Sequence, residues 1–209
     1  MTSESHTRAT ILTAARDLFA VHGYDGASVR AITARAGVNL GAVAYHFGSK
    51  QALYEAVTGE IAGAAAERIL AAARRGGSPL ERIDSVVGAF FTYLYENPVV
   101  PKLMIHTLAA REAMPEAVRS TMGANLRALA NVITEGQVDG SIRSGDPNLM
   151  ALSVASQPLW LAFARPILRD GVSLDQDDPS VRERIMKSVI DFIRAGLASD
   201  QGTDNETSN

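Results

Sequence analysis

SVRAITARAGVNLGAVAYHFGSK, residues 28–50, has the pattern of two short helices joined by a glycine turn, followed by the start of a third helix. Ser28 is a favourable N-cap, because its hydroxyl can accept a hydrogen bond from a backbone N–H that the first turn leaves free. Gly37 stands where the first helix must end, since glycine adopts left-handed backbone angles at little steric cost. Asn39 is expected to cap the second helix. The apolar side of that second helix consists of Leu40, Val43 and Phe47.

Two short helices with a tight turn form a helix-turn-helix, whose second helix enters the major groove of DNA. Here the pattern predicts the second helix over residues 39–47. We expect its outward residues to be small enough to approach base edges closely: Gly41, Ala42 and Ala44. Longer side chains suited to phosphate contact follow at Tyr45, His46 and Lys50. An ordinary pair of packed helices is an open alternative on this spacing alone.

The wider segment 11–57 resembles the N-terminal domain of the TetR family of transcriptional regulators. The matching positions are Ile11, Ala14, Ala15, Leu18, Phe19, 22–24, 28–30, Ile32, 36–38, Gly41, 45–47, Ser49, Lys50, Leu53 and Tyr54. The chain departs from the family pattern at Thr33, Ala44 and Gln51, where alanine, an aromatic and an acidic residue are frequent. The pattern and the resemblance together predict a DNA-binding surface made of Ser28, Arg30, Thr33, Asn39, Leu40, Gly41, Ala42, Tyr45, His46 and Lys50.

Composition points to an ordinary globular protein that works in a reducing compartment. The 209 residues include no cysteine, which excludes disulfides and thiolate chemistry and fits the cytoplasm. The start, MTSESHTR, lacks the features of a signal peptide, and no apolar run is long enough to span a membrane. The net charge is −3, yet residues 1–50 carry +2 and the remainder −5. A mildly basic head on an acidic body is compatible with DNA binding through one end.

Helical periodicity continues through the rest of the chain, and no strand-like alternation of useful length occurs. Helix starts with a capping residue followed by proline are found at 78–79, 146–147 and 178–179. The expected helices are 7–21, 28–36, 39–47, 49–73, 80–96, 98–110, 115–137, 147–169 and 179–198. The sequence thus predicts an all-α fold of about nine helices. Its expected parts are a three-helix helix-turn-helix head at 1–50, a regulatory and dimerisation bundle at 51–198, and a disordered tail at 199–209.

The body resembles the regulatory domain of the family in layout, and a helix bundle can hold a small molecule between its helices. Candidates for lining such a pocket are Phe90, Phe91, Leu94, Met104, Leu108, Met122, Leu126 and Trp160. Candidates for polar contacts to a ligand are His106, Arg111 and Glu112. Core packing is the open alternative for the apolar set, because apolar residues at helical spacing are usually packed.

The resemblance also implies that the last two helices pair with their copies across a two-fold axis as a four-helix bundle. Candidate interface residues are Leu152, Leu159, Phe163, Ile185, Val189 and Phe192. Pro158 and Pro166 are expected to kink or split helix 147–169, because each lacks an N–H and clashes with the preceding turn.

The leading hypothesis is a cytoplasmic homodimeric repressor that binds a palindromic site on double-stranded DNA and is released by a small hydrophobic ligand. A dimeric DNA-binding regulator without a small ligand is the alternative. An α-helical enzyme is disfavoured, because the chain has no cysteine, no His-Glu-x-x-His, no phosphate-binding glycine loop and only four separated histidines. No catalytic residue, metal ligand, cofactor or membrane partner is therefore assigned.

Overall fold

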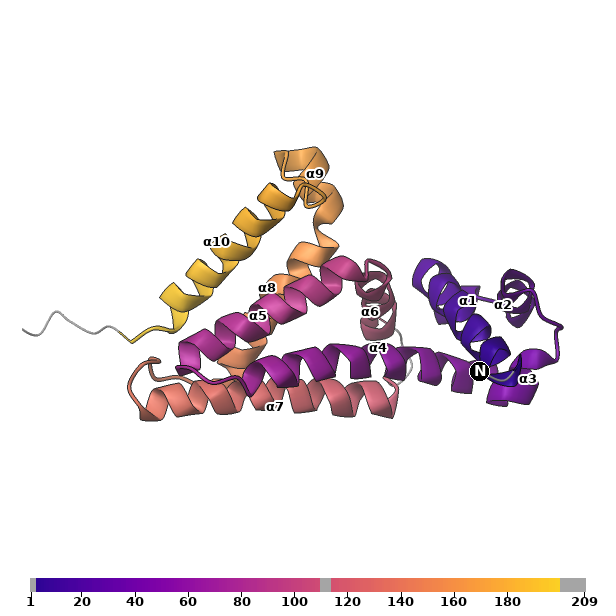
Figure 1. Ribbon diagram of the computed structural model, residues 1–209, viewed down its shortest axis with the longest axis horizontal. Helices are drawn as coiled ribbons and strands as arrows, with labels where there is room; N and C mark the ends of the chain where they lie inside the picture. Colours follow the sequence, from indigo (N-terminus) through magenta and orange to yellow (C-terminus); the bar gives the residue numbers. More distant parts are fainter. Residues whose placement is uncertain (1–2, 110–113, 200–209) are drawn as a thin grey trace, which may run out of the picture. The chain divides into compact units, whose positions relative to one another are not determined.

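A computed structural model describes residues 3–109 and 114–199, which form ten α-helices and no β-strand (Figure 1). The helices are α1 (Ser3–Gly26), α2 (Val29–Ala36), α3 (Ala42–Phe47), α4 (Lys50–Ala73), α5 (Pro79–Glu96), α6 (Val99–Ala109), α7 (Glu116–Val138), α8 (Pro147–Phe163), α9 (Arg165–Val172) and α10 (Pro179–Leu197). The predicted all-α fold is confirmed. No helix in these two ranges combines the length and the apolar character needed to cross a bilayer.

The additional helix comes from the region predicted as one helix over 147–169. Pro158 lies inside α8, whereas Pro166 occupies the first turn of α9, directly after a break at Ala164. A proline is tolerated in a first turn because its missing N–H has no helical partner there. Of the two predicted outcomes, a kink or a split, the structure shows a split directly before Pro166.

Helix α1 is longer than its pattern indicates. It begins at Ser3 and not at the expected residue 7. Gly23 interrupts the helix with φ 68° and ψ −177°, and a second, short helical segment then extends to Gly26. A Cβ atom at Gly23 would stand 3.2 Å from Nδ1 of His106, so the glycine also allows α6 to approach closely.

One compact unit comprises Met1–Ala66 and Glu96–Met122. Its core joins buried residues of α1 to α4 with Leu103 of α6, which is 2% exposed. Helix α6 packs on α1, and the buried hydroxyls of Thr107 and Tyr54 share a hydrogen bond of 2.8 Å between α6 and α4. The helix-turn-helix thus shares its core with a helix that lies far away in sequence. The boundary at residue 50 stays a prediction about the segment that acts as the DNA-binding domain.

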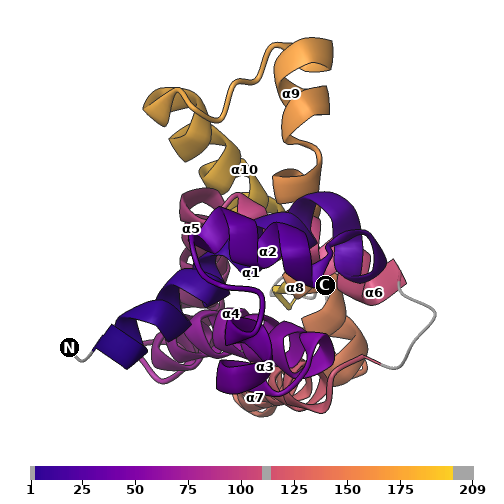
Figure 2. The ribbon, with the colours of Figure 1, turned by 90° about the vertical axis from the view of Figure 1, so that its right-hand side faces the viewer.

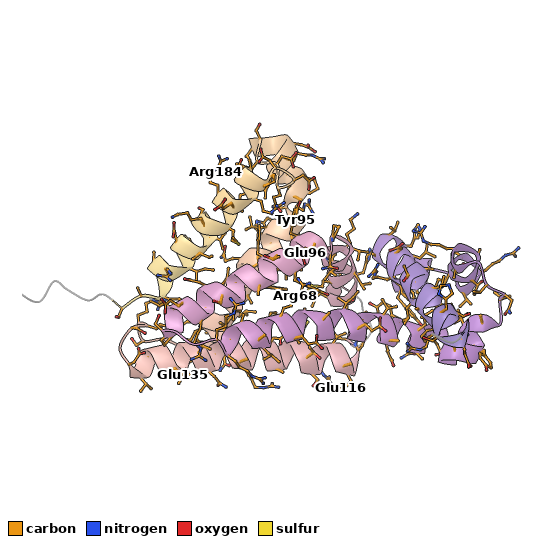
Figure 3. The ribbon with its side chains drawn as sticks, in the orientation of Figure 1. Arg68, Tyr95, Glu96, Glu116, Glu135 and Arg184 are labelled. Carbon is orange, nitrogen blue, oxygen red and sulfur yellow. The ribbon has the colours of Figure 1, made fainter. Side chains whose placement is uncertain are left out.

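The second compact unit comprises Glu67–Tyr95 and Gly123–Asn209. Its core is formed by buried residues of α4, α5, α7, α8 and α10. Two ion pairs join α5 to α7 and to α10. Arg82 pairs with Glu135, which is labelled in Figure 3, and Asp84 pairs with Arg194.

The predicted helix start at Ser78 is confirmed, and Ser78 forms a capping box with Glu81. The backbone N–H of Ser78 donates to the Glu81 carboxylate at 2.8 Å, and the Glu81 N–H donates to the Ser78 hydroxyl at 3.4 Å. The bond from the Ser78 N–H, together with a bond of 2.9 Å from the Ser78 hydroxyl to the same carboxylate, holds the pKa of Glu81 below its usual value.

The last described residues bond to the segment that follows α7. Ala198 forms an isolated antiparallel bridge with Ile142, and the Ser199 hydroxyl donates to the Gly140 carbonyl at 2.6 Å. Of the predicted disordered tail, only Ser199 is therefore described, and residues 200–209 lie outside the described residues.

Candidate DNA-binding site

The turn of the helix-turn-helix is fixed by the residues at the two ends of α2. Ser28 has an extended backbone, and its hydroxyl oxygen accepts a hydrogen bond from the Ala31 N–H at 3.1 Å. Gly37 adopts the left-handed region, with φ 67° and ψ 31°, and its N–H donates to the Ala34 carbonyl. The predicted cap and the predicted stop are both confirmed.

Helix α3 starts without a side-chain cap. The Ala42 N–H donates to the backbone carbonyl of Asn39 at 3.1 Å, and Gly41 occupies the N-cap position with no side-chain hydrogen bond. The expectation that Asn39 caps this helix with its side chain is therefore wrong, since the helix begins three residues later than the pattern suggested. Gly48, with φ 82°, ends α3.

One face of α3 is buried and the other is open to solvent. Ala42 and Val43 lie in the core of the first unit together with Ile32 of α2. Ala42 is only 7% exposed, so the expectation that it faces outward is wrong. The turn and the two short helices face the viewer in Figure 2. Within residues 39–47, the exposed ones are Asn39, Leu40, Gly41, Ala44 and Tyr45. Leu40 thus lies on the open surface and not on the apolar side, in contrast to its predicted place.

The residues expected from α2 divide between surface and interior. Thr33 is buried, and its hydroxyl donates to the Val29 carbonyl at 3.0 Å, so this side chain is satisfied within its own helix and unavailable to DNA. Arg30 is exposed in the first turn of α2. Arg35 is also exposed, but its guanidinium pairs with Asp17 of α1 at 2.6 Å.

Tyr45 is the most prominent side chain on the open face of α3, with 75% of its surface exposed. Its hydroxyl donates a hydrogen bond of 3.0 Å to the Glu4 carboxylate of α1. This bond, together with the negative charge of Glu4, holds the pKa of the Tyr45 phenol above its usual value. The ring of His46 meets Tyr45 edge to face, with ring centroids 4.9 Å apart.

Lys50 lies against the surface of the same unit. Its ammonium nitrogen is 4.4 Å from the ring centroid of Tyr24, and it donates to the Asp25 carbonyl at 3.5 Å. Exposed cation–π contacts contribute roughly 0.5–1 kcal/mol. A DNA phosphate can therefore replace these contacts, once the flexible side chain turns toward it.

The sequence did not predict that side chains from the first turns of α1 contact α3. Glu4 bonds to Tyr45, and the Arg8 guanidinium lies 5.0 Å from the ring centroid of Phe47. The spacing of four residues between Glu4 and Arg8 was the available signal, because residues i and i+4 share a helix face. It was overlooked because the helix was expected to start only at Thr7.

Two family descriptions match this chain. Residues 11–57 match "Bacterial regulatory proteins, tetR family", and residues 78–203 match "Tetracyclin repressor-like, C-terminal domain". The chain belongs to the TetR family of transcriptional regulators. This TetR-family protein is accordingly a DNA-binding regulator and not an enzyme.

Relatives of this TetR-family chain include both a transcriptional repressor and a transcriptional activator. The HTH-type transcriptional repressor AcnR of Corynebacterium efficiens is 42% identical over 64 residues, which cover 31% of this chain and 34% of that protein. The match thus spans about a third of AcnR. The HTH-type transcriptional activator FasR of Mycolicibacterium smegmatis is 30% identical over 175 residues, which cover 78% of this chain and 76% of FasR. A solved TetR-family regulator from Rhodococcus RHA1 shares the fold, with a TM-score of 0.78, 19% identity and coverage of 96% of this chain and all of that one.

The predicted pocket residues belong to both compact units of this TetR-family regulator. Met104, Leu108 and Met122 lie in the first unit, and the other five lie in the second. Phe91 and Leu94 are buried core residues, which is the alternative that the sequence left open. Trp160 is 63% exposed and Leu108 is also exposed, so neither lines a closed interior in this structure. Arg111 and Glu112 lie outside the described residues.

The predicted interface residues differ in exposure. Phe192 of α10 is 68% exposed and Leu152 of α8 is also exposed, whereas Leu159, Phe163 and Val189 are half-buried. Ile185 is buried within its own unit, so the expectation that it contacts a second copy is wrong for this conformation. Leu149 and Trp160 extend the exposed apolar set on α8.

Proposed function

We propose that this TetR-family regulator binds a palindromic operator as a homodimer and represses transcription until a small hydrophobic ligand releases it from DNA. The observation that carries the proposal is the open face of α3. Gly41 and Ala44 have small or no side chains and lie exposed beside the larger Tyr45. The backbone of the helix can therefore approach base edges closely while longer side chains contact phosphates. Operator DNA lies in the bacterial cytoplasm, so we expect the protein to act there.

Dimerisation is supported by apolar side chains that the second unit leaves exposed. Leu149, Leu152 and Trp160 of α8 and Phe192 of α10 present large apolar groups to solvent. Large exposed apolar side chains on two helices of one unit favour an interface with another chain. A two-fold symmetric dimer carries two copies of α3, and half-sites related by the same symmetry form an inverted repeat.

Repression is supported by the AcnR repressors, which match about a third of this chain. Activation is a second candidate, because the activator FasR matches over most of the chain. A promoter–reporter assay with the selected operator distinguishes the two: deletion of the regulator raises expression from the reporter under repression and lowers it under activation.

The direct test is selection of bound duplexes from a random pool, followed by sequencing. We expect an inverted repeat with a fixed half-site spacing. Sedimentation should give a dimer for the wild type and a monomer for Phe192→Glu. Val138→Glu, which charges an exposed apolar position at the end of α7, should remain a dimer. A pool without enriched motif, or a monomeric wild type, would contradict the proposal.

Release by a ligand is tested with a thermal-shift screen of small hydrophobic compounds. A compound well above its dissociation constant stabilises the folded protein by about 3–4 kcal/mol at 100 to 1,000 times that constant. A genuine effector must also lower DNA affinity in the same concentration range. Stabilisation without release, or no hit across chemical classes, favours the regulator without a small ligand.

A further inference from the structure

The first two turns of α1 place two charged side chains against α3. The Glu4 carboxylate accepts the hydrogen bond of the Tyr45 hydroxyl at 3.0 Å, and the Arg8 guanidinium lies over the Phe47 ring. Both residues stand before position 11, where the match to the family begins. The family match therefore assigns no role to this part of α1.

Tyr45 can donate only one hydrogen bond through its hydroxyl, because a phenol carries a single O–H. In the protein without DNA, that hydrogen points to an anionic carboxylate oxygen. A DNA phosphate oxygen is an anionic acceptor of the same kind. The phosphate can only accept a hydrogen bond, as Glu4 does. Because the phenol has one hydrogen for two acceptors, Tyr45 must break its bond to Glu4 before it can donate to DNA.

The carboxylate remains near the DNA after this exchange, because its backbone belongs to α1. Arg8, one turn further along α1, lies between the Phe47 ring and the Glu60 carboxylate of α4, at 5.0 Å from the ring centroid and 4.0 Å from the carboxylate. An unpaired carboxylate close to a phosphate is repelled electrostatically. Both the broken hydrogen bond and this repulsion oppose binding to any duplex, whatever its sequence.

We infer that Glu4 competes with a DNA phosphate for the Tyr45 hydroxyl and thereby lowers the affinity of this protein for duplex DNA. The inference rests on the proposed function of α3 as the DNA-reading helix. It assigns to the start of α1 a role as a built-in limit on DNA affinity.

The test compares dissociation constants of four full-length proteins for one selected duplex at one salt concentration, measured by fluorescence anisotropy. The proteins are the wild type, Glu4→Gln, Tyr45→Phe and the double variant. Glu4→Gln should bind roughly three- to tenfold more tightly, as expected for the loss of a surface charge contact in each of two heads. The matched control is Glu55→Gln, which removes the same charge from a side chain bonded to Gln51 within α4, and it should change affinity less than twofold.

The Tyr45→Phe background decides between competition and simple repulsion. Without the hydroxyl, the gain from Glu4→Gln should shrink to less than half of its value in the wild type. An equal gain in both backgrounds would show that Glu4 acts only through its charge, and the inference would be wrong. An unchanged or weakened affinity of Glu4→Gln would refute it as well, provided that melting temperatures show all four proteins folded. If the wild type binds no duplex, the proposed function fails first, which is a distinguishable result.

Discussion

Replacement of Gly41 by leucine should abolish specific DNA binding and leave the fold intact. Gly41 is exposed and has φ −74° and ψ −13°, a conformation that any residue adopts. A Cβ atom there would meet only Oδ1 of Asn39, at 3.5 Å, which is an ordinary van der Waals contact. The position therefore tests the approach to DNA separately from stability.

The expected change in stability is small because two effects oppose each other. A side chain restricts the unfolded chain and stabilises the fold by about 0.4–1 kcal/mol. An apolar residue is a poorer N-cap than glycine, at a cost of about 0.5–1 kcal/mol. The free energy of unfolding should thus change by about 1 kcal/mol or less, and the Tm by about 4 °C or less.

The expected change in DNA affinity is large. Each good base contact is worth about 1–3 kcal/mol, and a leucine at the start of α3 would hold the helix away from base edges in both heads of a dimer. We expect the affinity for a selected duplex to fall at least about 100-fold, which corresponds to about 2.7 kcal/mol. Fluorescence anisotropy gives the dissociation constant and circular dichroism gives the Tm.

Gly63→Ala is the control for this experiment, because the new Cβ on α4 would meet no atom within 4 Å apart from its chain neighbours and its own helical backbone. It should keep full DNA affinity. If Gly41→Leu bound the duplex within threefold of the wild type, the start of α3 would not lie in the groove. A Tm lower by more than 10 °C would instead show that the surroundings of Gly41 are less open than its neighbouring atoms indicate.

Three further predictions follow from the same structure. Lys50→Ala should lower DNA affinity and reduce the slope of log K against log salt by about 0.9 for each phosphate that the protein no longer neutralises, whereas an unchanged slope would show that Lys50 does not bind a phosphate. Leu103→Ala should destabilise the protein by about 2–5 kcal/mol in denaturant unfolding, because it leaves a cavity in the core of the first unit. The exposed neighbour Lys102 gives the control, Lys102→Ala. A destabilisation below about 1 kcal/mol would contradict the packing of α6 in this core. Acidification should lower the Tm as the pH falls below about 4. Hydrogen bonds from Ser180 lower the pKa of Asp178 in the folded state, and their stabilising contribution disappears when the carboxylate is protonated. Asp178→Asn should lessen this fall in Tm, and a variant with the same acid profile as the wild type would contradict the prediction.

Local chemistry made much of this fold predictable from the sequence. The N-cap at Ser28, the left-handed Gly37 and the capping box of Ser78 and Glu81 each depend on residues within about four positions of one another. Interactions at that range are set by backbone geometry and hardly by the rest of the molecule. The same holds for the split of the predicted helix 147–169 before Pro166.

Only the tertiary structure decided which side chains face solvent. Thr33 and Ala42 are small or weakly polar, and such residues are compatible with either surface or core, so their burial depends on what packs against them. The contact of Glu4 with Tyr45 spans 41 positions, and that of Tyr54 with Thr107 spans 53. Packing of distant helices brings these pairs together, and no short-range pattern encodes it. The sequence alone thus determined that a helix-turn-helix forms, while the packing of α1, α4 and α6 determined which of its residues remain free to meet DNA.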